Sequence, residues 1–477
     1  MSVRTRFAPS PTGFLHVGSA RTALYAWLFA RKHGGQFVLR IEDTDKEREV
    51  EGSIGHLMES LKWLGIQWDE SIDVGGPYEP YLQSARVASH QDYARRLIDA
   101  GYAYPDPYTP EEVDGFRKKA EEEKRPFLFR DHRPEQFEEW DGTKPLRFCV
   151  PVVKRYEWED VVFGKLSAGE EALDDFILIK GDGYPTYNFA HVIDDIEMRI
   201  THVMRGQEFI SSTPKFLSLY EALGETPPVF ATLPPILGDA GTKKLSKRDG
   251  AKDILEYREE GYLPEAMCNF LAFLGWNPGG EKEIYTRNEL IASFSLERIQ
   301  RSGAQFNEDK LLFMNREHMR TLSDEAFIER GLLVAPDSEK LRKAVPLLRE
   351  RTHTFGEARE MLKGELSCMW EAPTPQKDLL VAKEPAERAN LTKQALESIL
   401  GALEAAPDTL SADEAKALLM PIADAEEEKG KGGRGGVLWP TRYALSGLEK
   451  SPDPFTLISI LGVPESSSRL RSALAIL

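Results

Sequence analysis

The N-terminal part of the chain alternates between strand-like and helix-like segments, and this order constrains the fold more than any other feature. Residues 3–7 alternate apolar and polar side chains, which is the pattern of a half-buried β-strand. Residues 20–30 are rich in helix formers, and residues 37–41 favour a second strand. Strand, helix and strand in this order predict an α/β fold built on a parallel sheet.

The rest of the chain divides into an inserted region and a mainly helical end. A length of 477 residues corresponds to roughly three domains at about 150 residues each. Residues 101–184 show a mixed pattern, with strands expected at 148–153 and 175–180, before the sheet resumes at 199–204. From about residue 321 onward, Ala, Leu, Glu and Lys recur at helical spacing, which predicts an α-helical bundle.

Several helices are also marked by local patterns. Thr109, Thr286 and Ser411 are each followed three residues later by Glu, which is the capping-box pattern. Apolar side chains between residues 54 and 64 recur at helical spacing. We therefore expect helices to begin at the three hydroxyl residues, and a further helix over residues 54–64.

Composition excludes several classes of protein. The 61 basic and 78 acidic residues give a net charge of −17, which argues against coating nucleic acid through bulk charge but allows a local basic groove. The 3 cysteines, Cys149, Cys268 and Cys368, are far apart, so we expect no disulfide framework and a reducing, cytoplasmic location. No stretch approaches the ~18 apolar residues of a membrane span.

The N-terminal loop has the features of a phosphate-binding site. Residues 8–13 (APSPTG) form a stiff loop, and His16 and Gly18 follow where the first helix begins. A helix N-terminus attracts phosphate through its unpaired N–H groups and partial positive charge. A lone His is more often a capping or core residue, but the neighbouring loop favours a functional role. The GxGxxG pattern at 430–435 follows acidic residues and not a strand, so we interpret it as a glycine loop.

A strongly basic segment at residues 243–248 (KKLSKR) is the second informative motif. Such runs are usually solvated turns. The alternative is electrostatic, because ammonium groups stabilise the negative charge that develops on a phosphate group during its transfer.

Charged residues at three predicted strand ends form the third motif. Arg6, Glu42 and Arg205 follow or end strands, and ligands of parallel α/β sheets bind at the carboxyl ends of the strands. Each residue alone is more often a surface ion pair. Together, two Arg side chains could hold two carboxylates while Glu42 takes an ammonium group, which indicates an acidic amino acid as ligand.

These motifs together resemble the bacterial glutamyl-tRNA synthetases, which are class I aminoacyl-tRNA synthetases. Residues 16–19 match the HIGH signature of the family, with Ser19 in place of its last His, and residues 244–248 match KMSKS. The similarity covers nearly the whole chain, because it starts at residue 4 and continues through 39–45, 183–190, 203–208, 260–266 and 439–447.

The resemblance implies four domains. A Rossmann-like parallel-sheet catalytic domain would comprise residues 1–100 and 185–238, with an inserted α+β domain at 101–184 that binds the tRNA acceptor end. Residues 239–320 would contact the tRNA stem and carry the KLSKR loop, and residues 321–477 would form a mainly α-helical anticodon-binding domain.

The resemblance also implies roles for individual residues. The expected glutamate-binding residues are Arg6, Ala8, Ser10, Glu42, Tyr187, His191 and Arg205. The expected ATP-binding residues are Pro9, His16, Gly18, Glu208, Ile236, Lys244, Ser246 and Lys247. His16, Lys244 and Lys247 would be the catalytic groups, and Arg351 and Arg442 lie in stretches that resemble the anticodon-reading region.

Two positions depart from the family pattern. His191 stands where the family often has Asn, so its role in the glutamate pocket is open. Residues 102–104 (YAY) stand where some relatives carry a Cys-x-Cys zinc pair, so no zinc is expected.

The implied activity is that of a glutamate–tRNA ligase. Glutamate would react with ATP, accompanied by Mg²⁺, to give glutamyl-adenylate and pyrophosphate, and tRNA(Glu) would then accept the glutamyl group. A monomer is the family expectation.

The alternatives are a form that also charges tRNA(Gln), a glutaminyl-tRNA synthetase, a tRNA-modifying paralogue without the anticodon domain, and a non-enzymatic tRNA-binding protein. The helical C-terminal pattern, the length and the presence of His16 with both loop lysines disfavour the last three.

Overall fold

The computed structural model describes residues 2–238, 241, 243–245, 252–381, 386–428 and 433–477. The chain forms two compact units. The first unit contains the residues up to Arg258 together with Pro264–Met314, and the second contains Glu259–Leu263 and Asn315–Leu477.

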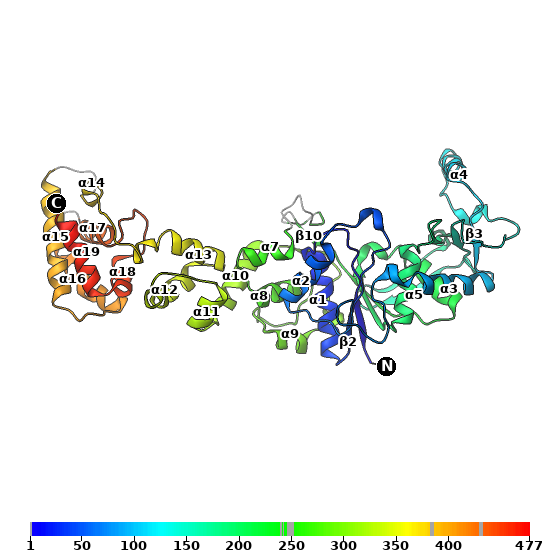
Figure 1. Cartoon of the computed structure of the whole chain (residues 1–477), viewed down its shortest axis with the longest axis horizontal. Helices are drawn as coiled ribbons and strands as arrows, with labels where there is room; N and C mark the ends of the chain where they lie inside the picture. The colour runs from blue at the N-terminus through cyan, green and yellow to red at the C-terminus, as the bar shows by residue number, and fades with distance from the viewer. Residues whose placement is uncertain (1, 239–240, 242, 246–251, 382–385, 429–432) are drawn as a thin grey trace. The chain divides into compact units, whose positions relative to one another are not determined.

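A six-stranded sheet forms the centre of the first unit (Figure 1). In spatial order, its strands are β2 (Gln36–Leu39), β1 (Arg4–Phe7), β8 (His202–Gly206), β9 (Val229–Leu233), β5 (Tyr156–Asp160) and β6 (Gly164–Ala168). Every pair is parallel except the antiparallel pair of β5 and β6. The predicted parallel α/β fold is therefore confirmed.

Helices cover this sheet and provide its buried contacts. Helix α1 packs on β1, β2 and β8, and nearly its whole length from Val17 to Ala30 is buried because apolar side chains face both the sheet and α8. The helices of this unit are α1 (Val17–Lys32), α2 (Ser53–Leu64), α3 (Val87–Asp99), α4 (Pro110–Glu122), α5 (Tyr187–Glu197), α6 (Thr213–Leu223), α7 (Ile254–Glu259, whose last residue belongs to the second unit), α8 (Pro264–Phe273) and α9 (Arg287–Ser293). Two short strands, β10 (Ile236–Leu237) and β11 (Ala304–Gln305), pair in parallel beside the sheet.

A second, three-stranded antiparallel sheet lies in the inserted region. Its strands are β3 (Ala103–Pro105), β4 (Leu146–Phe148) and β7 (Ile177–Ile179). The strand expected over 148–153 is wrong, because β4 ends at Phe148. Past that residue, the Val150 N–H donates to the Asp175 carboxylate, and Pro151 has no N–H to offer to a partner strand.

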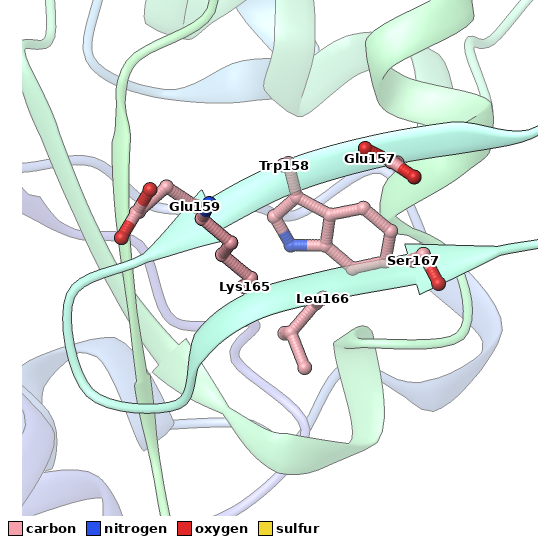
Figure 2. A pocket seen from close by; sticks show the side chains of 6 residues that line it. All are labelled: Glu157, Trp158, Glu159, Lys165, Leu166 and Ser167. Carbon is pink, nitrogen blue, oxygen red and sulfur yellow. The ribbon is translucent and has the colours of Figure 1, made fainter.

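The hairpin of β5 and β6 was not anticipated from the sequence. Trp158 lies opposite Leu166 and packs against buried residues that include Val38 and Val203 of the main sheet. Figure 2 shows the six residues of this hairpin that line a shallow hollow of about 410 Å³. The hairpin pairs with β9 through Asp160, so part of the stretch 101–184 joins the main sheet. The domain boundaries stay a prediction.

The second unit is helical, as its Ala- and Leu-rich sequence predicts. Its helices are α10 (Glu308–Arg320, which begins in the first unit), α11 (Asp324–Arg330), α12 (Ser338–Arg351), α13 (Phe355–Lys363), α14 (Lys377–Leu380), α15 (Ala386–Glu404), α16 (Ala412–Glu428), α17 (Gly435–Ser446), α18 (Pro454–Leu461) and α19 (Val463–Leu474). The capping boxes expected at Thr109, Thr286 and Ser411 are all present in the chain. Among the helices that the structure describes, none combines the length and apolar character needed to cross a bilayer.

The turn between α1 and β2 gives a test of the packing. A Cβ at Gly35 would lie 2.2 Å from the Val3 carbonyl oxygen, which accepts the Gln36 N–H, whereas a Cβ at Gly55 would meet nothing within 4 Å. We expect Gly35→Ala to lower the free energy of unfolding by about 1–3 kcal/mol. The control Gly55→Ala, inside α2, should raise it by about 0.5–1 kcal/mol. Urea unfolding followed by tryptophan fluorescence measures both, and equal effects would contradict the packing described.

Candidate active site

The carboxyl ends of β1, β8 and β9 border a cavity of about 390 Å³ in the first unit. This is the edge at which the sequence places its charged residues. The cavity is lined by most of the predicted site residues: Arg6, Ala8, Pro9, Ser10, His16, Gly18, Glu42, Tyr187, Arg205, Glu208, Ile236 and Lys244. The structure thus brings residues of five distant segments to one place.

The loop after β1 is fixed by backbone contacts. The Glu42 N–H donates to the Pro9 carbonyl at 3.0 Å, and the Ser53 hydroxyl donates to the Pro11 carbonyl at 2.9 Å. Two prolines limit the conformations of this loop, and these bonds hold it against the following segments. Ala8, Pro9 and Ser10 therefore line the cavity from an ordered backbone.

His16 caps helix α1 and also lines the cavity. Its Nδ1 accepts the Gly18 N–H at 3.1 Å, so in the neutral ring Nε2 carries the hydrogen. Nε2 lies 3.2 Å from the Ser19 hydroxyl. His16 therefore does cap the helix. The cap uses only Nδ1, so it does not exclude a functional role for Nε2 in the cavity.

Arg205 is a buried cation. Its guanidinium donates to the Thr213 hydroxyl at 2.7 Å and lies over the ring of Phe230. Burial lowers the pKa of Arg205 to about 10. In the part of the chain that the structure describes, no carboxylate lies within 4.0 Å of this guanidinium, and its Nε has no hydrogen-bond partner. Asp195 opposes the lowering of the Arg205 pKa only at longer range, so a buried positive charge with no ion-paired carboxylate among the described residues lies at the cavity wall, and it favours an anionic ligand.

Arg6 and Glu42 add opposite charges to the same cavity. Arg6 Nε lies 3.2 Å from Asp195 Oδ1, and Glu42 Oε1 lies 3.0 Å from Nη2 of Arg40. Burial raises the pKa of Glu42 to about 7, while Arg40 and Arg6 oppose this shift. Arg6, Arg205 and Glu42 therefore supply two guanidinium groups and one carboxyl to the cavity lining, a set that fits a ligand with two carboxylates and one ammonium group.

Tyr187 and His191 form a stacked pair on α5. Their ring centroids are 4.7 Å apart, and Nδ1 of His191 lies 2.7 Å from the Tyr187 carbonyl oxygen. Because a carbonyl only accepts, Nδ1 is the donor and Nε2 is left as an acceptor. Burial lowers the pKa of His191 to about 3 and keeps the ring neutral. Tyr187 lines the cavity, and His191 lies behind it, against Phe216.

The basic segment enters the cavity through Lys244. Its Nζ lies 3.4 Å from Glu208 Oε1, and both side chains are largely exposed. The backbone of Leu245 bonds to Ile236, which places Lys244 beside the strand β10. The predicted residues Ser246 and Lys247 lie outside the described residues.

The two predicted anticodon residues lie in the second unit. Arg351 is partly exposed and lies 3.6 Å from Glu365. Arg442 donates to the Ser451 hydroxyl and the Glu449 carbonyl, and its guanidinium covers the ring of Trp439. Their contact with an anticodon stays a prediction.

A second cavity of about 770 Å³ adjoins the first. Both cavities are lined by Ser10, Glu42 and Tyr187. The walls of the second cavity also carry charged and aromatic side chains, among them Lys46, Arg48, Lys180, Asp182 and Tyr184.

Comparison with known proteins identifies the family of this chain. Residues 2–313 match the family described as tRNA synthetases class I (E and Q), catalytic domain, and residues 316–474 match an anticodon binding domain. The chain is 40% identical to the glutamate–tRNA ligase of an Anaeromyxobacter species over 99% of both chains. It is 42% identical to that of Carboxydothermus hydrogenoformans over 98% of this chain and 99% of the relative. A crystal structure of a glutamate tRNA ligase from Elizabethkingia meningosepticum in complex with its amino acid matches 100% of both chains, with 35% identity and a TM-score of 0.87.

The chain belongs to the glutamate–tRNA ligase family of class I tRNA synthetases. The family, the fold class and the ligase class expected from the motifs are thereby confirmed.

The structure of this synthetase also reveals site residues that the sequence did not single out. Arg21 of α1 lines the cavity and donates to the carbonyls of Pro234 and Leu274, which fixes the segment before β10. Asp194 and Asp195 are buried on α5. Their sequence signal is weak: two adjacent acidic residues between the apolar residues Ile193 and Ile196 of a mixed helix.

Few carboxylates line the described cavity. Among the described residues, no group of three His, Cys, Asp or Glu side chains is placed to hold a metal ion. The carboxylates in the cavity lining are Glu42 and Glu208, and Glu208 already lies beside Lys244. This donor set fits a Mg²⁺ that triphosphate oxygens and water would mainly hold. At the former zinc-pair position, Tyr104 donates to Asp175, and the absence of zinc stays a prediction.

The buried charge of Arg205 gives a test that needs no ligand. We expect Arg205→Met to raise the free energy of unfolding of the ligand-free catalytic unit by about 1–3 kcal/mol, because a buried charge is replaced by an apolar chain of similar length. Thermal unfolding of the whole protein measures this effect. Arg155→Met, at an exposed position, is the control and should change the midpoint little. A lower melting temperature for Arg205→Met would contradict the electrostatic description.

Proposed function

We propose that this ligase activates L-glutamate with ATP in the 390 Å³ cavity and then transfers the glutamyl group to tRNA(Glu). The observation that carries the proposal is the pairing of two features in one cavity. A cage of Arg6, Arg205 and Glu42 fits a dicarboxylic amino acid, and the capped N-terminus of α1 lies in the same cavity with His16 and Lys244.

The cage orients glutamate by charge. Arg6 and Arg205 bind its carboxylates with paired N–H donors, and Glu42 in its ionised form accepts the ammonium group. Ala8, Ser10 and Tyr187 complete the walls. His191 supports the ring of Tyr187 by stacking and offers a neutral acceptor nitrogen.

Activation joins the α-carboxylate of glutamate to the α-phosphate of ATP. A carboxylate oxygen attacks phosphorus, the bond to the bridging oxygen breaks, and pyrophosphate leaves with the electron pair. No covalent enzyme intermediate is needed, so catalysis rests on positioning and charge stabilisation. His16 Nε2–H, the first turn of α1, Lys244 and Lys247 act on the phosphates, while Pro9, Gly18, Glu208, Ile236 and Ser246 hold the nucleotide. Mg²⁺ shields the phosphate charge when bound.

Transfer uses the second cavity. We assign its 770 Å³ to the 3′ end of the tRNA, because this cavity shares a wall with the amino-acid site and Tyr184 is an aromatic side chain on which a base can stack. Lys46, Arg48 and Lys180 are each paired with a carboxylate, so they bind phosphate only by exchanging these partners. The terminal 2′-hydroxyl then attacks the mixed anhydride, the new ester forms, and AMP leaves. Glu42 and Tyr187 lie on the boundary between the two cavities, where this attack takes place.

Other properties follow from this activity. The proposed partner RNA is cytoplasmic, so we assign the enzyme to the cytoplasm, and we expect it to act as a monomer. Residues 101–184 would bind the acceptor end, residues 239–320 the stem, and residues 321–477, with Arg351 and Arg442, the anticodon.

Aminoacylation of purified tRNAs with radiolabelled glutamate tests the function. We expect charging of tRNA(Glu), and parallel reactions with tRNA(Gln) determine whether the enzyme is discriminating. Reactions with radiolabelled glutamine identify a glutaminyl-tRNA synthetase instead. If neither tRNA is charged with either amino acid, the proposed function is wrong.

The KLSKR loop gives a mutational prediction. We expect Lys247→Ala to slow tRNA-dependent ATP–pyrophosphate exchange on the order of 10²-fold or more, because a group that stabilises transition-state charge is lost. Lys243→Ala in the same loop is the matched control, and its rate should stay within a few-fold of the unaltered enzyme. Near-normal exchange by Lys247→Ala would defeat the assigned role.

A further inference from the structure

Behind the cavity, one guanidinium bridges three buried carboxylates. Arg40 follows β2 and is fully buried. Its Nη2 lies 3.0 Å from Glu42, its Nη1 lies 2.9 Å from Asp195, and its Nε lies 3.7 Å from Asp194. Burial alone would lower the pKa of Arg40, but the three carboxylates outweigh burial and hold this pKa above its ordinary value. Arg40 is therefore a permanent cation held by groups on two different elements.

A second layer holds the carboxylate of Asp194. Arg86 Nε lies 2.6 Å and His90 Nε2 lies 2.9 Å from its Oδ1, and the amide of Gln83 donates to its Oδ2 at 2.8 Å. These side chains come from residues 83–90, which precede and begin α3. Through Asp194, Arg40 is thus linked to the residues that precede and begin α3.

The near side of Arg40 reaches both ends of the proposed amino-acid site. Nη2 of Arg40 contacts Glu42, which would receive the ammonium group. Nη1 of Arg40 contacts Asp195, and Asp195 also accepts the Nε hydrogen of Arg6, which would receive a carboxylate. Arg40 itself is absent from the cavity lining.

We propose that Arg40 is a positioning residue for glutamate: it holds Glu42 directly and Arg6 through Asp195, and so fixes the spacing between the ammonium and carboxylate subsites. This inference rests on the proposed function and adds a residue to which neither the motifs nor the relatives' names assign a role. It predicts that the geometry of the Arg40 fork, and not its charge alone, determines the affinity for glutamate.

The cluster as a whole is balanced in charge. Four guanidinium groups, those of Arg6, Arg40, Arg86 and Arg205, face four carboxylates, those of Glu42, Asp194, Asp195 and Glu197. A net charge of the cluster therefore does not select glutamate over glutamine. The selection depends on where the individual groups are held, and the Arg40 fork holds two of them, Glu42 directly and Arg6 through Asp195.

The protonation of Glu42 provides a signature. Glu42 faces Arg40 on its own segment, Arg6 of β1, Asp194 of α5 and, across the cavity, Tyr187. Burial raises its pKa to about 7, and Arg40 holds the value down. Weakening the contact with Arg40 raises this pKa further, so less Glu42 is ionised at neutral pH. The KM for glutamate should then improve as the pH rises, since the ammonium group needs the ionised form.

Two charge-conserving variants test the proposal. Lysine at position 40 has one ammonium group and cannot donate to Glu42 and Asp195 in the geometry of the fork. For Arg40→Lys we expect the KM for glutamate at pH 7 to rise roughly 10- to 100-fold, while kcat and the KM for ATP change little. The KM should then fall as the pH rises above 7, because the ionised fraction of Glu42 increases. Asp195→Glu should raise the KM for glutamate without that fall, because the contact between Arg40 and Glu42 remains.

The matched control is Glu70→Gln. Glu70 is also buried and pairs with Arg4 of the same strand β1, at 2.6 Å, but it lies outside the cavity lining. The Glu70→Gln variant should be less stable than the unaltered enzyme, while its KM for glutamate should stay the same. Thermal unfolding is measured for all variants, so a folding defect is recognised as a loss of kcat in proportion to the folded fraction.

The outcomes are distinct. A drop in kcat with an unchanged KM for glutamate in both Arg40→Lys and Asp195→Glu would reduce Arg40 to a structural role and overturn the inference, while the charging activity of the unaltered enzyme would leave the proposed function in place. An equal rise in the KM for ATP would also overturn it. If the unaltered enzyme does not charge tRNA with glutamate, the proposed function fails and the inference fails with it.

Discussion

The burial of charge at the carboxyl ends of the central strands is the constraint on which the catalytic unit depends. Transferring an ion into a protein interior is unfavourable unless partners surround it. Here α5 supplies adjacent carboxylates, Asp194 and Asp195, which reach guanidinium groups on β1, on the segment after β2 and on the segment before α3. The ion pairs therefore tie together elements that are far apart in sequence. Arg205 is the exception, because no carboxylate among the described residues forms an ion pair with it. It lies at the cavity wall, where an anionic ligand would balance its charge.

The cavity residues were predictable because their sequence context is unusual. Two prolines near a helix start, and Arg or Glu directly after apolar strands, have few structural explanations, and the topology of a parallel sheet brings such positions to one edge. Arg6, Glu42, His16 and Arg205 all line the cavity for this reason. The roles of these residues rest on the resemblance to the family and on the geometry together.

The supporting residues were not predictable in the same way. Arg40 stands between two apolar residues of a strand-like segment, and nothing local shows that it faces three carboxylates. The hairpin of β5 and β6 has a local signal, because Tyr156 and Trp158 alternate with Glu157 and Glu159. Its place in the main sheet has none, because Asp160 pairs with Phe230, which is 70 residues away. The strand expected over 148–153 ended early because side-chain and proline effects outweighed β-propensity. Lys247, on which part of the mechanism rests, lies outside the described residues.

The wall shared by the two cavities has a thermodynamic consequence. Ser10, Glu42 and Tyr187 face both spaces, so an occupant of one space alters the surface that the other presents. If a bound RNA end changes the affinity for the amino acid by some factor, a bound amino acid must change the affinity for the RNA end by the same factor, because linkage between binding equilibria is reciprocal. The proposed ligands of the two cavities therefore share three side chains, and these side chains can couple their binding.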